Sequence, residues 1–308
     1  MSQPSSADRT GAMDGVSLAL LVFTVIIWAS AFAGIRVGLT VFGPIELGAL
    51  RFLIAGVPAA IYLAITRPPL PRLGELWRFA WGGVVFIGLY TALLNTGEQT
   101  VPAGAASFII NVSPIITALF AVATLGERFP PRAWAGTALS FAGVAVIAYG
   151  QGGGLIFNRD ALFILGAAVC TASGMIVQKP LFPRHHPLMV SAWNMVLGAL
   201  VLSPALPSAF AALPRASGEV IGALFFLGIF SSLVGYATWT VALSRLPASR
   251  ASNFLYSLPP AAALVGYFWL GEVPSWLTVI GGAMSLAGVV LVNWRRRRPK
   301  DELIETAG

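Results

Sequence analysis

Apolar residues gather into long uninterrupted runs along the chain, and polar residues fall between these runs. Ten runs can be marked, at about 15–37, 44–66, 77–98, 103–124, 130–150, 160–179, 187–207, 219–242, 248–270 and 274–294. Each run is close to the roughly 20 residues that a helix needs to cross the hydrocarbon core of a bilayer. The pattern predicts an all-α, polytopic membrane protein with ten transmembrane helices and no soluble domain.

The composition agrees with a membrane protein. Only 10% of the 308 residues are charged, 57% are hydrophobic, and the mean hydropathy is +0.81, whereas a soluble domain carries about 25% charged residues. A single cysteine, Cys170, excludes an intrachain disulfide and a cysteine-based metal site. The net charge of +7 comes from Lys and Arg in short loops and a tail. We therefore expect no cofactor, no metal and no nucleic-acid partner.

One stretch of the chain occurs twice. Residues 100–150 return without a gap as residues 245–295, with 16 identities in 51 aligned positions, including the triplet Leu-Gly-Glu at 125–127 and 270–272. Matches of Pro, Gly and Glu in register indicate a tandem duplication. Each copy holds five apolar runs, an odd number, so the two copies must cross the membrane in opposite directions. We expect an inverted-topology repeat of residues 15–150 and 159–295, the architecture that secondary transporters use for alternating access.

Basic residues indicate how the chain is oriented. Placing both termini in the cytoplasm puts 15 of the 19 basic residues inside and three, Arg36, Arg159 and Arg215, outside, with Arg51 left within a run. Short cytoplasmic loops of membrane proteins carry an excess of Lys and Arg. Residues 296–308 are then a basic cytoplasmic tail, and the expected location is a bacterial inner membrane.

Several sequence features resemble a known family. They are Trp28-Ala29-Ser30-Ala31-Phe32 in the first run, Leu50-Arg51-Phe52 in the second, and the Leu-Gly-Glu triplets that end the fourth and ninth runs. With the ten runs in two halves, they make the chain similar to the EamA-type drug/metabolite transporters over residues 15–294, and most like the YddG-type exporters of aromatic amino acids. The resemblance implies export of small metabolites through a cavity between the two halves.

Enzymatic activity is not expected. The two histidines, His185 and His186, are adjacent in a loop between runs, so no run offers a Ser–His pair or a histidine metal site. All four aspartates lie at or outside the ends of runs. No phosphate-binding glycine-rich loop ends in lysine, so ATP does not drive this protein directly.

Prolines interrupt the fourth and ninth runs at matching positions. Pro114, and Pro259 with Pro260, lie about a dozen residues inside these runs. A proline inside a helix removes an N–H donor and displaces the carbonyl four residues earlier. We expect helix kinks at these prolines, with Asn111 and Asn253 nearby at mid-depth, where unsatisfied polar groups are costly. The alternative is that the prolines merely bend the helices and the amides join them to their neighbours.

Small residues spaced by four also recur in the two copies. Gly136 and Ser140 in the fifth run correspond to Gly281 and Ser285 in the tenth. Such spacing permits helices to approach closely, so we expect these runs to pack tightly against other helices.

Aromatic residues suggest where a substrate binds. Tryptophans near the ends of runs are expected in the interfacial belt, namely Trp77, Trp81, Trp134, Trp239, Trp269, Trp276 and Trp294. Other aromatics lie deeper, where they face either lipid or a cavity that would favour apolar and aromatic solutes. The sequence predicts a substrate site between the halves that comprises Trp28, Tyr90, Asn111, Trp193, Tyr236, Asn253 and Tyr256.

Carboxylates are scarce within the runs. Arg51, five residues beyond Glu46, is expected to pair with Glu46 or to extend toward the interface. The triplet residues Glu127 and Glu272 are expected to cap a helix or to pair in the next turn. Because no Asp, Glu, His or Lys lies at mid-run, we expect a facilitator with weak dependence on a proton gradient. Glu98, near an outer end, is the residue that would couple transport to protons if a water-filled cavity reached it.

Three functions remain open at this stage. The leading hypothesis is a secondary exporter of small amphipathic metabolites, particularly aromatic or hydrophobic amino acids. A multidrug or nucleoside-type exporter with the same fold is the second. A membrane scaffold or receptor-like protein is disfavoured, because it needs no inverted repeat. The expected partners are a small-molecule substrate and the lipid bilayer, and a homodimer is compatible with the sequence.

Overall fold

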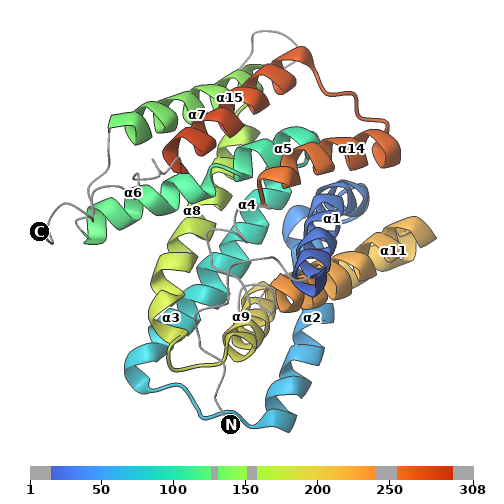
Figure 1. Ribbon diagram of the computed structural model, residues 1–308. Helices are drawn as coiled ribbons and strands as arrows, with labels where there is room; N and C mark the ends of the chain where they lie inside the picture. Colours follow the sequence, from blue (N-terminus) through green and yellow to red (C-terminus); the bar gives the residue numbers. More distant parts are fainter. Residues whose placement is uncertain (1–14, 126–130, 151–157, 240–254, 294–308) are drawn as a thin grey trace, which may run out of the picture.

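The computed structural model describes residues 15–125, 131–150, 158–239 and 255–293, and every regular element in these ranges is a helix (Figure 1). Six helical segments are long and apolar enough to cross a membrane: Leu18–Gly38, Pro44–Thr66, Leu73–Gly97, Asp160–Gln178, Pro187–Arg215 and Gly218–Trp239. Four shorter apolar helices cover Ala103–Thr117, Trp134–Ile147, Leu258–Leu270 and Trp276–Gly288. The predicted all-α membrane class is confirmed.

The described elements divide between the two copies of the repeat. The first copy of the repeat contains α1 (Gly15–Gly38), α2 (Pro44–Thr66), η1 (Leu73–Glu75), α3 (Leu76–Trp81), η2 (Gly82–Leu89), α4 (Tyr90–Gly97), α5 (Ala103–Ile110), α6 (Ser113–Leu125) and α7 (Pro131–Gly150). The second contains α8 (Asp160–Gln178), η3 (Lys179–Leu181), α9 (Pro187–Leu202), η4 (Ser203–Ala205), α10 (Leu206–Ala212), η5 (Leu213–Arg215), α11 (Gly218–Phe225), η6 (Phe226–Val234), η7 (Leu255–Ser257), α14 (Leu258–Leu270) and α15 (Trp276–Asn293).

The two copies meet through equivalent residues in α7 and α15, which lie side by side (Figure 1). Ser140 Oγ donates a hydrogen bond of 2.8 Å to the carbonyl oxygen of Ser285, its counterpart 145 residues later. A Cβ atom added to Gly281 would meet the carbonyl oxygen of Gly143, and one added to Gly143 would meet that of Gly281. Helices α7 and α15 therefore approach closely, as the small residues predict. The glycines leave no side chain between the two backbones, which come into direct contact.

Two π-helical segments also occupy corresponding places. Segment η2 lies between α3 and α4, and η6, which starts 144 residues later, lies between α11 and helical residues 235–239. π-Helical turns are rare and occur frequently at functional sites, since the wider turn redirects side chains and backbone groups. Both π segments contribute residues to the site described below.

The fourth apolar run is two helices rather than one kinked helix. Helix α5 ends at Ile110, Asn111 and Val112 form a turn, and Pro114 is the second residue of α6. Pro259 and Pro260 likewise lie in the first turn of α14, after the short η7. A proline is readily accommodated in the first turn, where its missing N–H has no intrahelical partner. The prolines therefore begin new helices, which is a larger interruption than the predicted kinks.

Large apolar side chains cover much of the outer surface. Ile65, Phe268 and Trp276 are among the most exposed, and the expected belt residues Trp77 and Trp134 are exposed as well. Exposure of this kind suits contact with lipid. Lipid tails are themselves apolar, so apolar side chains gain little by moving from the lipid to the space between helices. Polar and charged groups instead gather inside the protein and at the helix ends, where the candidate site lies.

Candidate functional site

The described part of the chain brings three of the predicted site residues together with a buried arginine. We name this group the aromatic–arginine cluster. It comprises Trp28 of α1, Arg51 of α2, Phe86 of η2, Tyr90 of α4, Ser231 and Ser232 of η6, and Tyr236 and Trp239 just beyond η6. Its members come from both copies of the repeat, so it lies at the junction between them.

Trp28 is the aromatic centre of the cluster. Its ring centroid lies 5.5 Å from that of Tyr236, in an edge-to-face arrangement, and 5.5 Å from that of Trp239. Its indole Nε1 donates a hydrogen bond of 3.1 Å to the carbonyl oxygen of Ser231. The ring of Tyr236 also stands edge-to-face against Phe86, at 6.4 Å. Trp239 is only 8% exposed, so its assignment to the interfacial belt is wrong: its ring faces Trp28 instead of the membrane interface.

Arg51 is the charged member of the cluster and is 7% exposed. Its Nε donates to Ser232 Oγ at 2.9 Å, and its Nη2 donates to Ser231 Oγ at 3.2 Å. The expectation that Arg51 pairs with Glu46 or extends to the interface is wrong, because Glu46 accepts a hydrogen bond from Ser208 instead. Helix α2 packs against η6, and this contact draws the guanidinium inward across the repeat junction.

A second polar group joins the two copies at the end of α1. Arg36 Nε lies 3.1 Å from Glu272 Oε1, and Arg36 Nη1 donates to the carbonyl oxygens of Glu98 and Gln99 at 2.6 and 3.0 Å. Glu272 Oε2 accepts a hydrogen bond from the backbone N–H of Ala103, the first residue of α5. The triplet glutamate therefore caps α5 and forms an ion pair, and both partners belong to the other copy of the repeat.

Glu98 directly follows α4, and its backbone carbonyl oxygen is one of the two that accept from Arg36. Its side chain is completely buried, and neither carboxylate oxygen has a hydrogen-bond partner within the described ranges. The charged groups whose fields reach it are Arg36, Glu272 and Arg51. The position of Glu98 near the end of an apolar run suggests an exposed carboxyl group. It is nevertheless buried, because other parts of the protein cover it.

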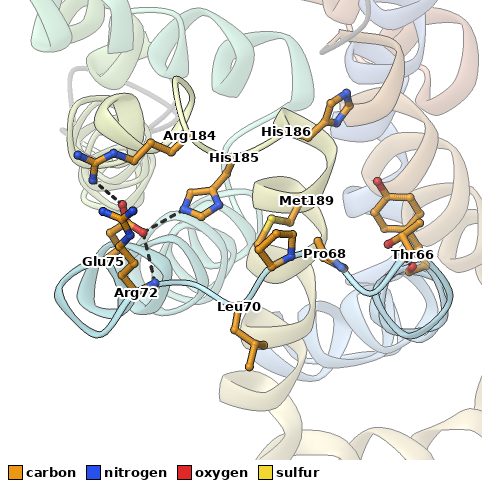
Figure 2. Close-up of a pocket in the computed structure, with 11 residues that line it drawn as sticks. Thr66, Pro68, Leu70, Arg72, Glu75, Arg184, His185, His186 and Met189 are labelled. Carbon is orange, nitrogen blue, oxygen red and sulfur yellow. Dashed lines mark hydrogen bonds and ion pairs between the residues drawn. The ribbon is translucent and has the colours of Figure 1, made fainter.

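A third polar group lies where α2 ends and α9 begins, and it borders a cavity of about 440 Å³ (Figure 2). Glu75 is its centre, with Oε1 2.8 Å from Arg184 Nη1 and Oε2 3.0 Å from His185 Nε2. The backbone N–H of Arg72 also donates to Glu75. This carboxylate links the loop after α2 to the loop before α9, and so it too joins the two copies.

Trp193 and Asn111 lie apart from the aromatic–arginine cluster. Trp193 packs against a separate group that contains Phe79, Leu181, Met189 and Val190, and its buried indole nitrogen has no hydrogen-bond partner among the described residues. Asn111 directly follows α5 and is 7% exposed, and its Nδ2 likewise has no partner in the described part of the chain.

The side chains of two predicted site residues and of one triplet glutamate are not among those that the structure describes. Asn253 and Glu127 lie outside the described residues, and for Tyr256 only the backbone, within η7, is described.

Comparison with known proteins identifies the family of this chain. Residues 15–149 and residues 159–294 each match the EamA-like transporter family. The chain belongs to this family. As an EamA-like transporter it is a multi-pass membrane transporter and not an enzyme, which confirms the resemblance noted in the sequence.

Individual relatives share most of the chain's length. It is 38% identical to the "Probable terminal-alkyne amino-acid exporter" of Streptantibioticus cattleyicolor over 281 residues, which cover 90% of this chain and 94% of that relative. An "Uncharacterized transporter" of Archaeoglobus fulgidus is 31% identical, covering 90% and 98% of the two chains. A solved crystal structure aligns with a TM-score of 0.61 at 20% identity, covering 91% of this chain and 97% of that one. This last likeness concerns the fold alone.

Sequence reasoning missed the contact of Arg51 with Ser231 and Ser232 across the two copies. Arg51 carried the clearest signal, because an ionisable residue within a membrane span is a functional candidate by default. Ser231 and Ser232 carried little signal of their own. Their role depends on which face of the eighth apolar run meets α2, and the sequence pattern does not show that.

Proposed function

We propose that this transporter exports small amphipathic metabolites, specifically amino acids with apolar or aromatic side chains, by alternating access between its two repeats. The aromatic–arginine cluster is the observation that carries this proposal. It combines aromatic rings in edge-to-face and tilted contact, which favour apolar and aromatic solutes, with a buried cation at the junction of the repeats. The terminal-alkyne amino-acid exporter supports the same substrate class, because that relative's named cargo is an amino acid.

The proposed architecture is ten transmembrane helices in two five-helix inverted repeats. The meeting of Ser140 with its counterpart Ser285 supports it, as do the two π segments at corresponding positions. The excess of basic residues in alternate loops supports cytoplasmic termini, in a bacterial inner membrane. In this orientation the Arg36–Glu272 pair lies on the external side and the Glu75 group on the cytoplasmic side.

The two ionic groups suit the gates of an alternating-access cycle. Each joins one repeat to the other, and each lies on a different side of the aromatic–arginine cluster. A gate needs contacts that can be made in one state and broken in the other. Arg36 and Glu272 are partly exposed, as is Arg184 in the Glu75 group, and an ion pair that reaches solvent contributes only about 1 kcal/mol. Substrate would then reach the cluster from the cytoplasm when the Glu75 group opens, and leave when Arg36 releases Glu272.

Counterflow in proteoliposomes tests this proposal. Vesicles that contain the full-length protein are loaded with unlabelled L-phenylalanine or L-propargylglycine, a terminal-alkyne amino acid, and the entry of labelled L-phenylalanine is followed. We expect entry well above that in protein-free vesicles. Trp28→Ala and Tyr236→Ala should lower it about fivefold or more, since each removes an aromatic contact of about 1 kcal/mol.

Trp134→Ala, which removes an exposed aromatic ring away from the cluster, is the matched control and should leave entry within about twofold. Counterflow of uridine or of a hydrophobic cation, with none for any amino acid, would favour the nucleoside or multidrug alternative. Equal losses in the control and cluster variants would remove the support for the cluster as the substrate site.

A further inference from the structure

Arg51 carries a positive charge that its protein partners do not neutralise. The ion pairs within the described ranges are Arg36–Glu272, Arg184–Glu75 and His185–Glu75, and none involves Arg51. Its two hydrogen-bond acceptors, Ser231 and Ser232, are neutral hydroxyl groups. An arginine inside the membrane region is costly and usually pairs with another group or marks a substrate path.

Within the described part of the chain, no carboxylate forms an ion pair or a hydrogen bond with Arg51. The ionisable side chains whose fields reach the guanidinium are Tyr90, Tyr236 and Glu98. The phenols are neutral at physiological pH, and the oxygens of Glu98 form no hydrogen bond to Arg51. The guanidinium instead lies beside the rings of the aromatic–arginine cluster, because both bind the same residue. Ser231 accepts from Arg51 through its hydroxyl oxygen and from Trp28 through its carbonyl oxygen.

The second repeat shows that helix packing at this place does not require a charge. When Pro44, at the start of α2, is aligned with Pro187, at the start of α9, Asn194 takes the position in the second repeat that Arg51 takes in the first. Asn194 exchanges two hydrogen bonds with Gln178, at 2.9 and 3.1 Å. A neutral amide, paired with Gln178 of α8, therefore stands at this position of α9, which packs against η2 as α2 packs against η6. If Arg51 served only to join α2 to η6, a neutral side chain would do so at a lower desolvation cost.

We propose that the Arg51 guanidinium binds the carboxylate of the transported amino acid, whose side chain then packs against Trp28, Tyr236 and Trp239. The inference rests on the proposed function. Arginine suits this role because its planar guanidinium can form two parallel hydrogen bonds to one carboxylate. Its Nε and Nη2 are held by the two serines, which fixes the plane of the group before substrate arrives. Amines that lack the carboxylate are then excluded from the site, because they leave the buried charge uncompensated.

The first test uses the unaltered protein. Counterflow of labelled L-phenylalanine is measured in competition with unlabelled L-phenylalanine, L-phenylalaninamide and phenylethylamine, which share the ring but differ at the carboxylate. We expect the amide and the amine to compete at least about tenfold more weakly, since a charge-assisted pair is worth 1.5 kcal/mol or more. Equal competition by all three would overturn the role of Arg51 and leave the proposed export of amino acids standing. Absence of counterflow for every amino acid would instead reject the proposed function.

The second test changes the residue. Arg51→Gln should raise the KM for L-phenylalanine about tenfold or more and abolish the preference over the amide. Arg51→Lys keeps the charge but loses the planar fork, so it should raise KM about tenfold while keeping part of that preference. Arg215→Gln, at an exposed arginine, is the matched control. Full discrimination in Arg51→Gln, or an unchanged KM in Arg51→Lys, would overturn the proposal.

Discussion

Arg36 and Glu272 hold the two repeats together across 236 positions of sequence, with Arg36 Nε 3.1 Å from Glu272 Oε1. The pair does more than join two side chains. Through its other atoms Arg36 also holds the chain after α4, and Glu272 holds the first residue of α5. Opening this side of the protein therefore requires several contacts to break together, which makes the pair the most direct place to perturb the proposed cycle.

Glu272→Gln should open the external side more often. The glutamine can still accept from Ala103, but it removes the charge that attracts Arg36. Access is measured with a membrane-impermeant maleimide on a cysteine introduced at Ala105, a buried residue beside Glu272, in a Cys170→Ala background. We expect labelling to rise by up to about fivefold, because a partly exposed pair is worth up to 1 kcal/mol.

Glu219→Gln is the control for this measurement, because Glu219 is an exposed carboxylate whose partner, Trp269, belongs to the same repeat. Equal labelling in the two variants would mean that the Arg36–Glu272 pair does not restrain access.

Glu75→Gln should have the opposite effect on the same cysteine. Glu75 accepts hydrogen bonds from Arg184, His185 and the backbone of Arg72. Removing its charge weakens the links on the proposed cytoplasmic side, so the population moves toward states open to the cytoplasm and closed outside. Labelling of the cysteine at position 105 should fall about twofold or more. An increase would show that the two ionic groups do not act as opposed gates.

The sequence predicted the helical class and the family, and its small residues correctly indicated close packing of α7 and α15. These features depend on local pattern and composition. The partners of Arg51 and Glu272 could not be predicted in the same way, since each lies 169 or more positions away. The choice between Glu46 and Ser232 as the partner of Arg51 depends on which helix packs against α2.

The aromatic residues show the same limit. Trp28 and Tyr236 were predicted to share a site and their rings are in contact, whereas Trp193 packs elsewhere. Depth along an apolar run can be counted from the sequence. The direction in which a ring points cannot, and this is why Trp239 resembled a belt residue.

Gly281→Val should destabilise the contact between α7 and α15. The added side chain would meet the carbonyl oxygen of Gly143 and the side chain of Ile147, so the helices must separate. Overpacking of this kind costs about 1–3 kcal/mol and should lower the thermal unfolding midpoint of the purified protein by several degrees. Gly222→Val, where an added Cβ meets nothing within 4 Å, is the matched control. Similar midpoints for the two variants would argue against tight packing at this contact.

A reporter enzyme that is active only in the periplasm should be silent when fused after Gly308. We expect this because the bias of 15 basic residues against three favours a cytoplasmic C-terminus. The same reporter fused after Arg215, the last residue of η5, should be active. Activity after Gly308 together with silence after Arg215 would reverse the orientation, and would exchange the external and cytoplasmic roles of the two ionic groups.

Glu98 changes the expectation about energy coupling. From the sequence, every carboxylate lies too near a run's end for a proton relay, which favours a facilitator. In the structure the Glu98 carboxyl is fully buried and its oxygens have no hydrogen-bond partner within the described ranges. A carboxyl group in such a place is far more stable with its proton than without it. Movement of Arg36 away from Glu272 would offer Glu98 a cationic partner and favour release of that proton.

We therefore predict that transport of the substrate is coupled to proton movement. In proteoliposomes with equal L-phenylalanine on both sides, an imposed pH difference should drive net accumulation by the unaltered protein. Glu98→Gln should abolish this accumulation while keeping counterflow within about threefold, because the amide has the shape of the protonated acid but cannot release a proton. Glu46→Gln, at a carboxylate that accepts a hydrogen bond from Ser208, should behave like the unaltered protein. If the unaltered protein shows counterflow but no accumulation, the transporter is a facilitator and the burial of Glu98 is structural.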